Sequence, residues 1–284
     1  MIRNPYQSTR STSSGRAALV VAHPGHELAL TGWITKTQPT VFVITDGSGQ
    51  LCRPRLHSTT KALLRSGARP GSIYGHLSDR EVYEAMLRRD AGLFLRMTFE
   101  LADWIFLDDI DYVVGDSAEG YNPMHDVCRI IVGGAVELAT RLRGRRIGNY
   151  EYVVTGQRTD CIAGRCSDTI RLTLDDDALE QKIAAAVAYP ELASEVEGAI
   201  RREGLEAFRY ECLHPVDNRT SWTPDQNSKP HYEEHGESRV ASGKYRHPVR
   251  YAEHIVPLQT AFWETLSKTL DTQVWTSSVG AEMR

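Results

Sequence analysis

The chain has no long apolar run and no surplus of positive charge. None of its apolar stretches approaches the ~20 residues that a membrane-spanning helix needs, and residues 1–16 are polar, without the apolar core of a signal peptide. The formal net charge is -4, so the chain as a whole has no attraction to nucleic acid. We therefore expect a cytoplasmic protein with a small-molecule substrate, no nucleic-acid partner and no membrane partner. We make no prediction of its oligomeric state.

Cysteine is scarce, and glycine-rich phosphate loops are missing. The five cysteines are odd in number, scattered and without a CxxC pair: Cys52, Cys128, Cys161, Cys166 and Cys212. This pattern indicates neither a disulfide framework nor a zinc module, so we expect buried or inert thiols. Neither GxGxxG nor a P-loop follows the first apolar run, and Gly47-Ser48-Gly49 is too short to replace them. A nucleotide-binding enzyme is therefore a weak alternative.

What the sequence does contain is an alternation of strand-like runs and helix-length segments, which is typical of a parallel α/β sheet. The predicted strands are rich in β-branched and aromatic residues and cover 17–22, 40–45, 112–115, 150–155 and 171–174. The predicted helices have apolar residues at three-to-four spacing and cover 28–36, 58–66, 79–105, 127–142 and 177–208. We predict an α/β fold with a Rossmann-like, mostly parallel sheet flanked by helices.

The chain changes character near its C-terminal quarter. We predict a flexible leader over 1–15, a Rossmann-like catalytic domain over 16–212 and an irregular C-terminal extension over 213–284, packed on the same domain as a wrap or lid. Five prolines interrupt this extension, which carries one predicted helix near 259–270. His231 and His235 would share a helix face, but the flanking proline and glycine leave room for barely two turns. We favour a structural or lid role for this segment over a second metal site.

Three histidines are predicted to meet at one edge of the sheet. His23 and His26 follow the first predicted strand, and His125 opens the helix that follows another strand. Carboxyl ends of parallel strands lie at the same edge, where α/β proteins bind ligands, and neutral imidazole is the commonest ligand of zinc. We predict a three-histidine site with a position open for water. Zinc is expected, and Fe, Co or Ni also suit such ligands. The alternative is that these histidines cap helices or fill the core.

The segment Ala22–Glu27, AHPGHE, resembles the AHPDDE signature of the PIG-L/LmbE-like deacetylases. These zinc-dependent enzymes remove acetyl groups from N-acetylated sugars and related amides. The resemblance continues in order with Thr45-Asp46-Gly47, with Arg55 at the next helix start and with His125 as the histidine of the third motif, and covers about residues 17–155. It implies a Rossmann-like fold and a metal-dependent amide hydrolase, an N-deacetylase of a small N-acetylated sugar or related metabolite.

The chain departs from the family at the residues that move protons. The resemblance implies a general base and a metal ligand at positions 25 and 26, where this chain has Gly25 and His26. His26 can still bind metal, and the exchange raises the charge of the site by one, which would lower the pKa of a bound water further. Gly25 cannot act as a base. The family's His-x-Asp-His becomes Asn122-Pro123-Met124-His125, so its auxiliary acid histidine is lost too.

Another carboxylate must then serve as the base. The acidic residues predicted at this edge are Glu27, Asp46, Asp116, Glu119 and Asp126. We favour Asp46 and Asp126 as catalytic residues. Their structural alternatives are a turn for Asp46 and, for Asp126, a helix cap or a partner that orients His125.

Substrate contacts are predicted for Arg55, Tyr121 and Asn122, because a guanidinium can hold a carboxylate, a phosphate or a sugar hydroxyl in a fixed fork. The alternative function is a divergent family member that lacks the aspartate base. Such a chain would have a different metal-dependent activity or act as a non-catalytic module that binds metal or a small molecule.

Overall fold

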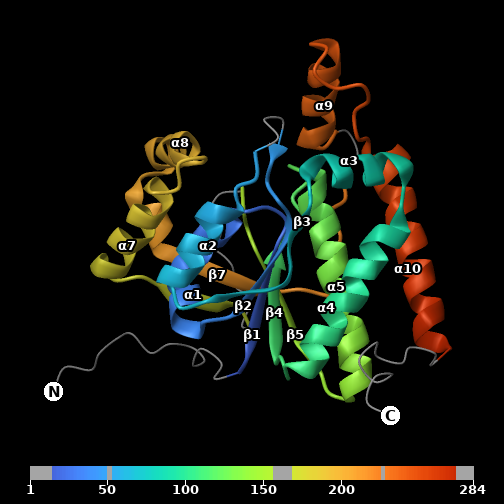
Figure 1. The fold of residues 1–284 in the computed structure, drawn as a ribbon, viewed down its shortest axis with the longest axis horizontal. Coiled ribbons are helices and arrows are strands. Elements are labelled where there is room, and N and C mark those ends of the chain that lie inside the picture. The colour runs from blue at the N-terminus through green and yellow to red at the C-terminus, as the bar shows by residue number, and fades with distance from the viewer. Residues whose placement is uncertain (1–14, 50–52, 156–167, 225–227, 273–284) are drawn as a thin grey trace.

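The computed structural model describes residues 15–49, 53–155, 168–224 and 228–272 (Figure 1). Residues 1–14 of the predicted leader, and Cys52, Cys161 and Cys166, lie outside the described residues. The described strands form one seven-stranded sheet in the order β3-β2-β1-β4-β5-β7-β6. They are β1 (Ala17–Val21), β2 (Thr40–Thr45), β3 (Arg69–Leu77), β4 (Tyr112–Asp116), β5 (Gly148–Tyr152), β6 (Ile170–Thr173) and β7 (Tyr210–Pro215).

The sheet is parallel from β3 to β5, and the antiparallel strand β7 joins β5 to β6. The chain runs outward from β1 through β2 to β3, and then returns to the other side of β1 as β4. The strand order therefore reverses between β1 and β4, which is where open α/β sheets form their ligand crevice. The predicted α/β fold is confirmed.

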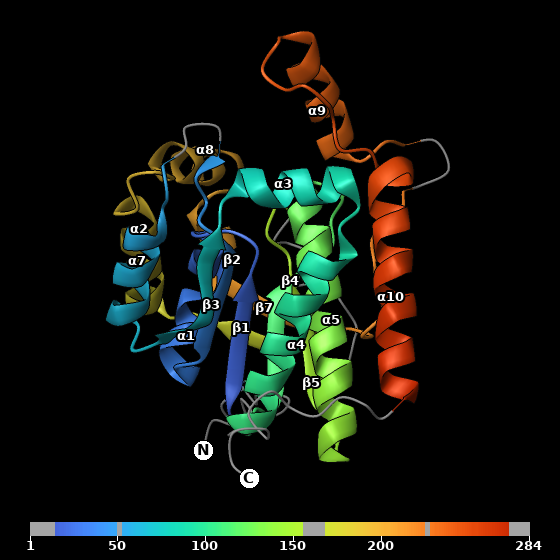
Figure 2. The same cartoon turned by 45° about the vertical axis from the view of Figure 1, so that its right-hand side comes forward.

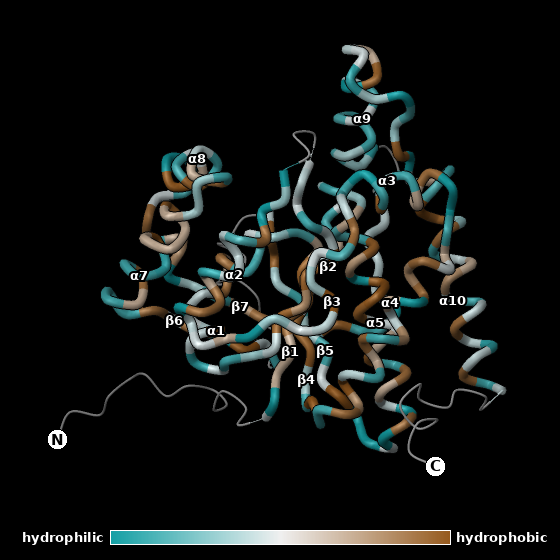
Figure 3. The backbone as a smooth tube through the Cα atoms, in the orientation of Figure 1, coloured by the Kyte–Doolittle hydropathy of each residue, from teal (hydrophilic) through white to brown (hydrophobic). Residues whose placement is uncertain are grey.

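Helices cover both faces of the sheet because residues in each strand alternate between two cores. Ala18 and Val20 face α4 (Ala91–Leu107), α5 (Pro123–Arg143) and α10 (Val256–Asp271). Leu19 and Val21 face α1 (Thr31–Thr37) and α2 (Leu56–Arg65). Figure 3 shows the hydrophobic stretches gathered in the strands and on α4 and α5. No helix among the described residues is long and apolar enough to cross a membrane.

Two helices predicted as continuous are each divided in two. The segment 79–105 forms α3 (Asp79–Arg88) and α4, because Arg89 takes a left-handed conformation and the Asp90 side chain accepts a hydrogen bond from the backbone N–H of Leu93. The segment 177–208 forms α7 (Asp176–Val187), α8 (Ala193–Glu203) and most of the 3-10 turn η3 (Leu205–Arg209). Pro190 explains this second break, since it lacks a backbone N–H and restricts the residue before it.

Two strands were missed by the sequence analysis. β3 contains Pro70, Gly71 and Gly75, which hide its pattern, but an edge strand tolerates them. β7 begins two residues after the predicted helix 177–208, where no strand was predicted, and it spans the domain boundary expected at residues 212 and 213. Its Cys212 is disulfide-bonded, which corrects the expectation of inert thiols at this position. Cys128 is free and buried, as expected.

The extension after residue 213 is more helical than predicted. It contains α9 (His231–Ala241), the π-helical turn η4 (Tyr251–Ile255) and α10, which includes the predicted helix near 259–270. α9 continues through Gly236, so the expectation of barely two turns was wrong. Leu258, Phe262 and Leu266 of α10 fill the core beside α4 and α5, and α9 projects from the body beyond α3 (Figure 2).

A buried ion pair between Lys182 and Glu211 joins α7 and β7 to the segment that follows the loop after β1. Lys182 of α7 donates to Glu211 of β7 at 2.8 Å and to the carbonyl of Ala29 at 2.7 Å. Glu211 also accepts hydrogen bonds from the backbone N–H groups of Gly32 and Trp33 at the start of α1. Both charged side chains are almost fully buried. The pair therefore fixes the turn η1 (His26–Leu30) and α1 against the rest of the fold.

Candidate metal centre

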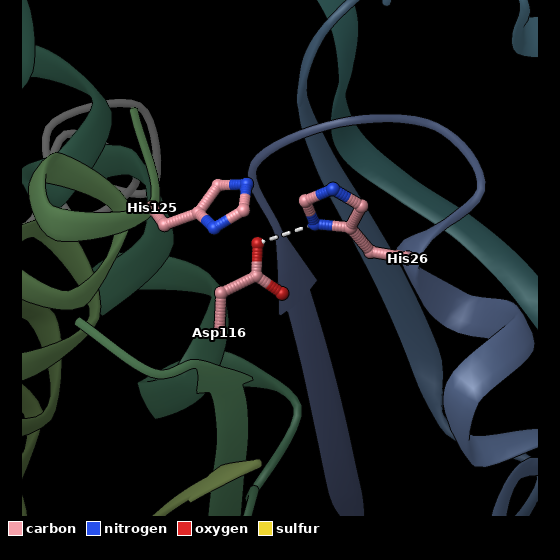
Figure 4. A group of neighbouring side chains, drawn as sticks. All are labelled: His26, Asp116 and His125. Atoms are coloured by element: carbon pink, nitrogen blue, oxygen red, sulfur yellow. Dashed lines mark hydrogen bonds and ion pairs between the residues drawn. The ribbon is translucent and has the colours of Figure 1, made fainter. Parts of the chain in front are cut away.

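Three imidazole rings meet at the carboxyl ends of β1 and β4. The ring centroids of His26 and His125 are 4.7 Å apart, those of His23 and His26 5.3 Å, and those of His23 and His125 5.7 Å. Asp116, the last residue of β4, lies between His26 and His125 (Figure 4). One ligand atom from each of His26, Asp116 and His125 lies within 4.8 Å of those of the other two. The structure thus brings the three predicted histidines together and adds a carboxylate.

The local backbone explains how the first two histidines reach the site. β1 ends at Val21, and Gly25 then takes a φ of 103°, which L side chains rarely adopt, before His26 opens η1. A Cβ on Gly25 would lie 2.2 Å from Cδ1 of Leu192, the residue that precedes α8. The backbone conformation therefore favours glycine at position 25, and any side chain there would also require Leu192 to move.

The environment of His23 determines which of its nitrogens is free. Nδ1 lies 2.9 Å from the Thr45 hydroxyl and 3.2 Å from Oδ1 of Asp79. The Asp79 carboxylate can only accept a hydrogen bond, so Nδ1 is the donor, and the Thr45 hydroxyl, which donates to the carbonyl of Ala22, accepts as well. Nδ1 therefore carries the proton. Nε2 is buried and has no hydrogen-bond partner among the described residues, which leaves its lone pair available to a metal.

His26 is held by Asp116 in the same manner. Nδ1 of His26 donates to Oδ2 of Asp116 at 2.7 Å, and Asp116 also accepts from the backbone N–H of Ala22 and from the Tyr152 hydroxyl. Burial opposes ionisation of Asp116, but the charge and hydrogen bond of His26 outweigh it and hold the pKa of Asp116 well below its usual range. Two ligand atoms on one tetrahedral zinc would be about 3.3 Å apart. The shorter contact is that of a hydrogen-bonded carboxylate–histidine pair.

His125 is placed by its helix. Asn122 caps α5 by accepting from the backbone N–H of Met124 at 2.9 Å, and Pro123 follows at the first helical position. His125 is buried, and its Nδ1 has no hydrogen-bond partner among the described residues. Burial, followed by the nearby His26, lowers the pKa of His125 well below its usual value. The imidazole therefore stays neutral, as a metal ligand must.

These residues fit a bound transition metal. Buried polar nitrogens normally have hydrogen-bond partners, and here His23 Nε2 and His125 Nδ1 have none within the described part of the chain. Imidazole nitrogen is a ligand for Zn, Fe, Co and Ni. Outer carboxylates on ligand histidines, as Asp79 and Asp116 provide, are a common feature of such sites.

The two carboxylates that the sequence analysis favoured bond to their own loops. The half-buried Asp46 accepts from the backbone N–H of Ser48 at 2.9 Å, in the turn after β2. Asp126 is buried, and its Oδ1 accepts from the backbone N–H of Gly120 at 3.2 Å, while its Oδ2 has no hydrogen-bond partner among the described residues. Burial raises the pKa of Asp126 to about 7.

The predicted substrate contacts have different surroundings. Arg55 donates from Nε to the carbonyl of Gly47 at 2.8 Å, and a Cβ on Gly47 would meet both Arg55 and Pro24 of the first loop. Tyr121 is 46% exposed and stacks on His231 of α9, with ring centroids 4.3 Å apart. The Asn122 side chain is occupied by its helix cap. Arg55 therefore lies near Pro24 of the first loop, whereas Tyr121 packs against α9, and their contact with a substrate stays a prediction.

Thr45, Asp79 and Tyr152 contact the histidines or Asp116 but were not predicted as site residues. Asp79 follows Ser78, and Ser78 and Glu81 form the predicted capping box. Thr45 and Tyr152 are the last residues of their strands. The rule that predicted the histidines and Asp116 at this edge, polar residues at strand ends, also applies to Thr45 and Tyr152.

No protein-family model matches the chain, and no curated protein matches it. Among solved structures it is similar to a deacetylase triple mutant, Orf2*T, from the teicoplanin biosynthetic pathway, with 13% identity, a TM-score of 0.47 and coverage of 75% of this chain and 100% of the other. The zinc-inhibited form of teicoplanin deacetylase Orf2 has 13% identity, a TM-score of 0.44 and the same coverages. The conserved protein TT1542 from Thermus thermophilus has 15% identity, a TM-score of 0.44 and coverages of 76% and 100%. At these values we base the function on the site residues alone.

Proposed function

We propose that this chain is a metal-dependent amide hydrolase that removes the acetyl group from a small N-acetylated sugar or related metabolite. The observation that carries the proposal is the convergence of His23, His26 and His125, two of them with buried unpartnered nitrogens, within a motif that resembles that of deacetylases. These three residues would hold the metal. Zinc is the proposed ion, and Fe, Co or Ni fit the same ligands.

A metal held by these histidines would polarise the acetyl carbonyl and activate a water molecule. The chain itself orients the ligands through Asp79 and Asp116. We assign proton transfer to Asp126 ahead of Asp46, because Asp126 Oδ2 has no hydrogen-bond partner among the described residues, whereas Asp46 serves a turn. Arg55 and Tyr121 would contact the substrate at the rim, with Asn122 supporting the helix between them.

The second candidate is a metal-binding module, or an enzyme with different metal chemistry. Gly25 favours it, because the position where the family has its base has no side chain and Leu192 occupies the space beside it. A cytoplasmic location stays a prediction. The disulfide at Cys212 is more typical of an oxidising compartment.

Acetate release from a panel of N-acetyl sugars, with metal content measured on the same preparations, tests the proposal. We expect release that requires metal and falls to background in His125→Ala. The exposed His57 on α2 supplies the matched control, since His57→Ala removes an imidazole outside the centre. Bound metal without acetate release under any metal supplement would contradict the hydrolase and favour the binding module. Absence of stoichiometric metal under all conditions would contradict both.

A further inference from the structure

We infer that Asp79 is a positioning residue for His23: it fixes the ring so that Nδ1 carries the proton and Nε2 faces the centre. The part of this inference that concerns metal rests on the proposed function. The part that concerns the ring applies to the protein without metal. Asp79 is distant in sequence, 56 residues beyond His23, and lies outside the segments that resemble the deacetylase motifs.

The Thr45 hydroxyl alone cannot determine the tautomer of His23. A hydroxyl can accept from Nδ1–H or rotate to donate to an unprotonated Nδ1. An ionised carboxylate only accepts. Asp79 therefore requires a proton on Nδ1, and Thr45 follows by directing its own proton to the carbonyl of Ala22. Removing the carboxylate would leave the ring free to adopt either tautomer.

Asp79 can impose this constraint because its own position is fixed from two sides. It is the first residue of α3, whose start is secured by the capping box of Ser78 and Glu81. Its second oxygen accepts from the backbone N–H of Gly49 at 2.7 Å, in the loop after β2. The carboxylate thus links the first loop, the β2 loop and α3 while only partly exposed to solvent.

The consequence for a metal is a better ligand in a fixed direction. A carboxylate on the far nitrogen of a ligand histidine fixes its orientation and increases its basicity, and loss of such a partner costs about 10–100-fold in metal affinity. Asp116 bears the same relation to His26. Two outer carboxylates therefore support two of the three imidazoles.

The first test is nitrogen NMR of histidine-labelled protein without metal. We expect wild-type His23 to be the Nδ1–H tautomer and Asp79→Ala to show both tautomers in exchange. Glu81→Ala is the matched control, because it removes the other half of the α3 start without touching His23. An unchanged tautomer in Asp79→Ala would overturn the inference.

The second test is competition for Zn²⁺ or Co²⁺ between each variant and a chelator. We expect Asp79→Ala to lose about 10–100-fold in affinity, Asp79→Asn to lose less, and Glu81→Ala to match wild type. Equal losses in Asp79→Ala and Glu81→Ala would show a merely structural role and overturn the inference. Failure of wild type to bind either ion would contradict the proposed function, while the NMR result would still decide the role of Asp79 in positioning the ring.

Discussion

The two sides of the candidate centre hold their imidazoles by different means. His23 and His26 lie on a loop, and each has a carboxylate on its second nitrogen. His125 lies in the first turn of α5, where its neighbours Met124 and Val127 are buried, and its Nδ1 has no such partner among the described residues. A helix fixes a side chain by backbone geometry and packing, whereas a loop needs specific hydrogen bonds. The loop side should therefore depend on single side chains more strongly than the helix side.

The largest effect is expected from Asp116→Ala. It leaves the backbone N–H of Ala22, the Tyr152 hydroxyl and Nδ1 of His26 without their buried partner. We expect a loss of about 3–5 kcal/mol in the free energy of unfolding, measured by urea denaturation without metal. Asp46→Ala, in a half-buried turn, should cost about 1 kcal/mol or less. Equal stability of the two variants would show that the loop side does not depend on its carboxylate.

Gly25→Ala should come next, with a loss of about 2–4 kcal/mol, because it combines a strained φ with a collision against Leu192. Adding Leu192→Ala to Gly25→Ala removes the collision but leaves the strained φ at position 25. The double-mutant cycle should therefore show a favourable coupling of about 1 kcal/mol or more. Additive effects on the free energy of unfolding would show that Leu192 does not restrict the side chain at position 25.

On the helix side, Asn122→Ala should cost only the about 1 kcal/mol typical of an N-cap. If packing holds His125, zinc affinity should change little, by less than about 3-fold, which is about half of one tenfold step of 1.4 kcal/mol. Asp90→Ala removes the equivalent cap of α4 and is the matched control for stability. A large fall in zinc affinity in Asn122→Ala alone would show that the helix side also depends on one side chain.

The smallest effect is expected at Cys128, one turn after Met124 in α5. The thiol is buried against the carbonyl of Val20, and burial raises the pKa of Cys128 well above its usual value. We expect its alkylation in the native protein to be far slower than after denaturation, followed by mass spectrometry. Rapid native labelling would show that α5 opens readily and that packing does not fix His125.

The sequence predicted the fold where local pattern and tertiary structure agree. The strands β1, β2 and β4 are buried, apolar and bounded by turn residues, so composition alone locates them. β3 contains proline and glycine that only an edge position permits, and β7 follows a helical stretch. Whether such segments pair depends on neighbours far away in the chain, which composition does not report.

The same distinction applies to the centre. The histidines were predicted because each lies at a strand end or helix start, a local property. The partnership of His26 with Asp116 joins residues 90 positions apart, and no spacing rule indicates which strand-end carboxylate meets which ring. It also changes the expected electrostatics: imidazole at position 26 raises the charge of the ligand set, but the ionised Asp116 beside it restores a negative charge.

The contact between Gly25 and Leu192 ties the residue at position 25 to one that lies far along the chain. A chain with an acidic residue at position 25 cannot also carry the leucine where it lies here, since the two side chains would occupy the same space. An acidic side chain at position 25 would therefore require Leu192 to turn away or to be replaced by a smaller residue. Positions 25 and 192 are therefore coupled, and a carboxylate placed in the loop after β1 requires a change at both.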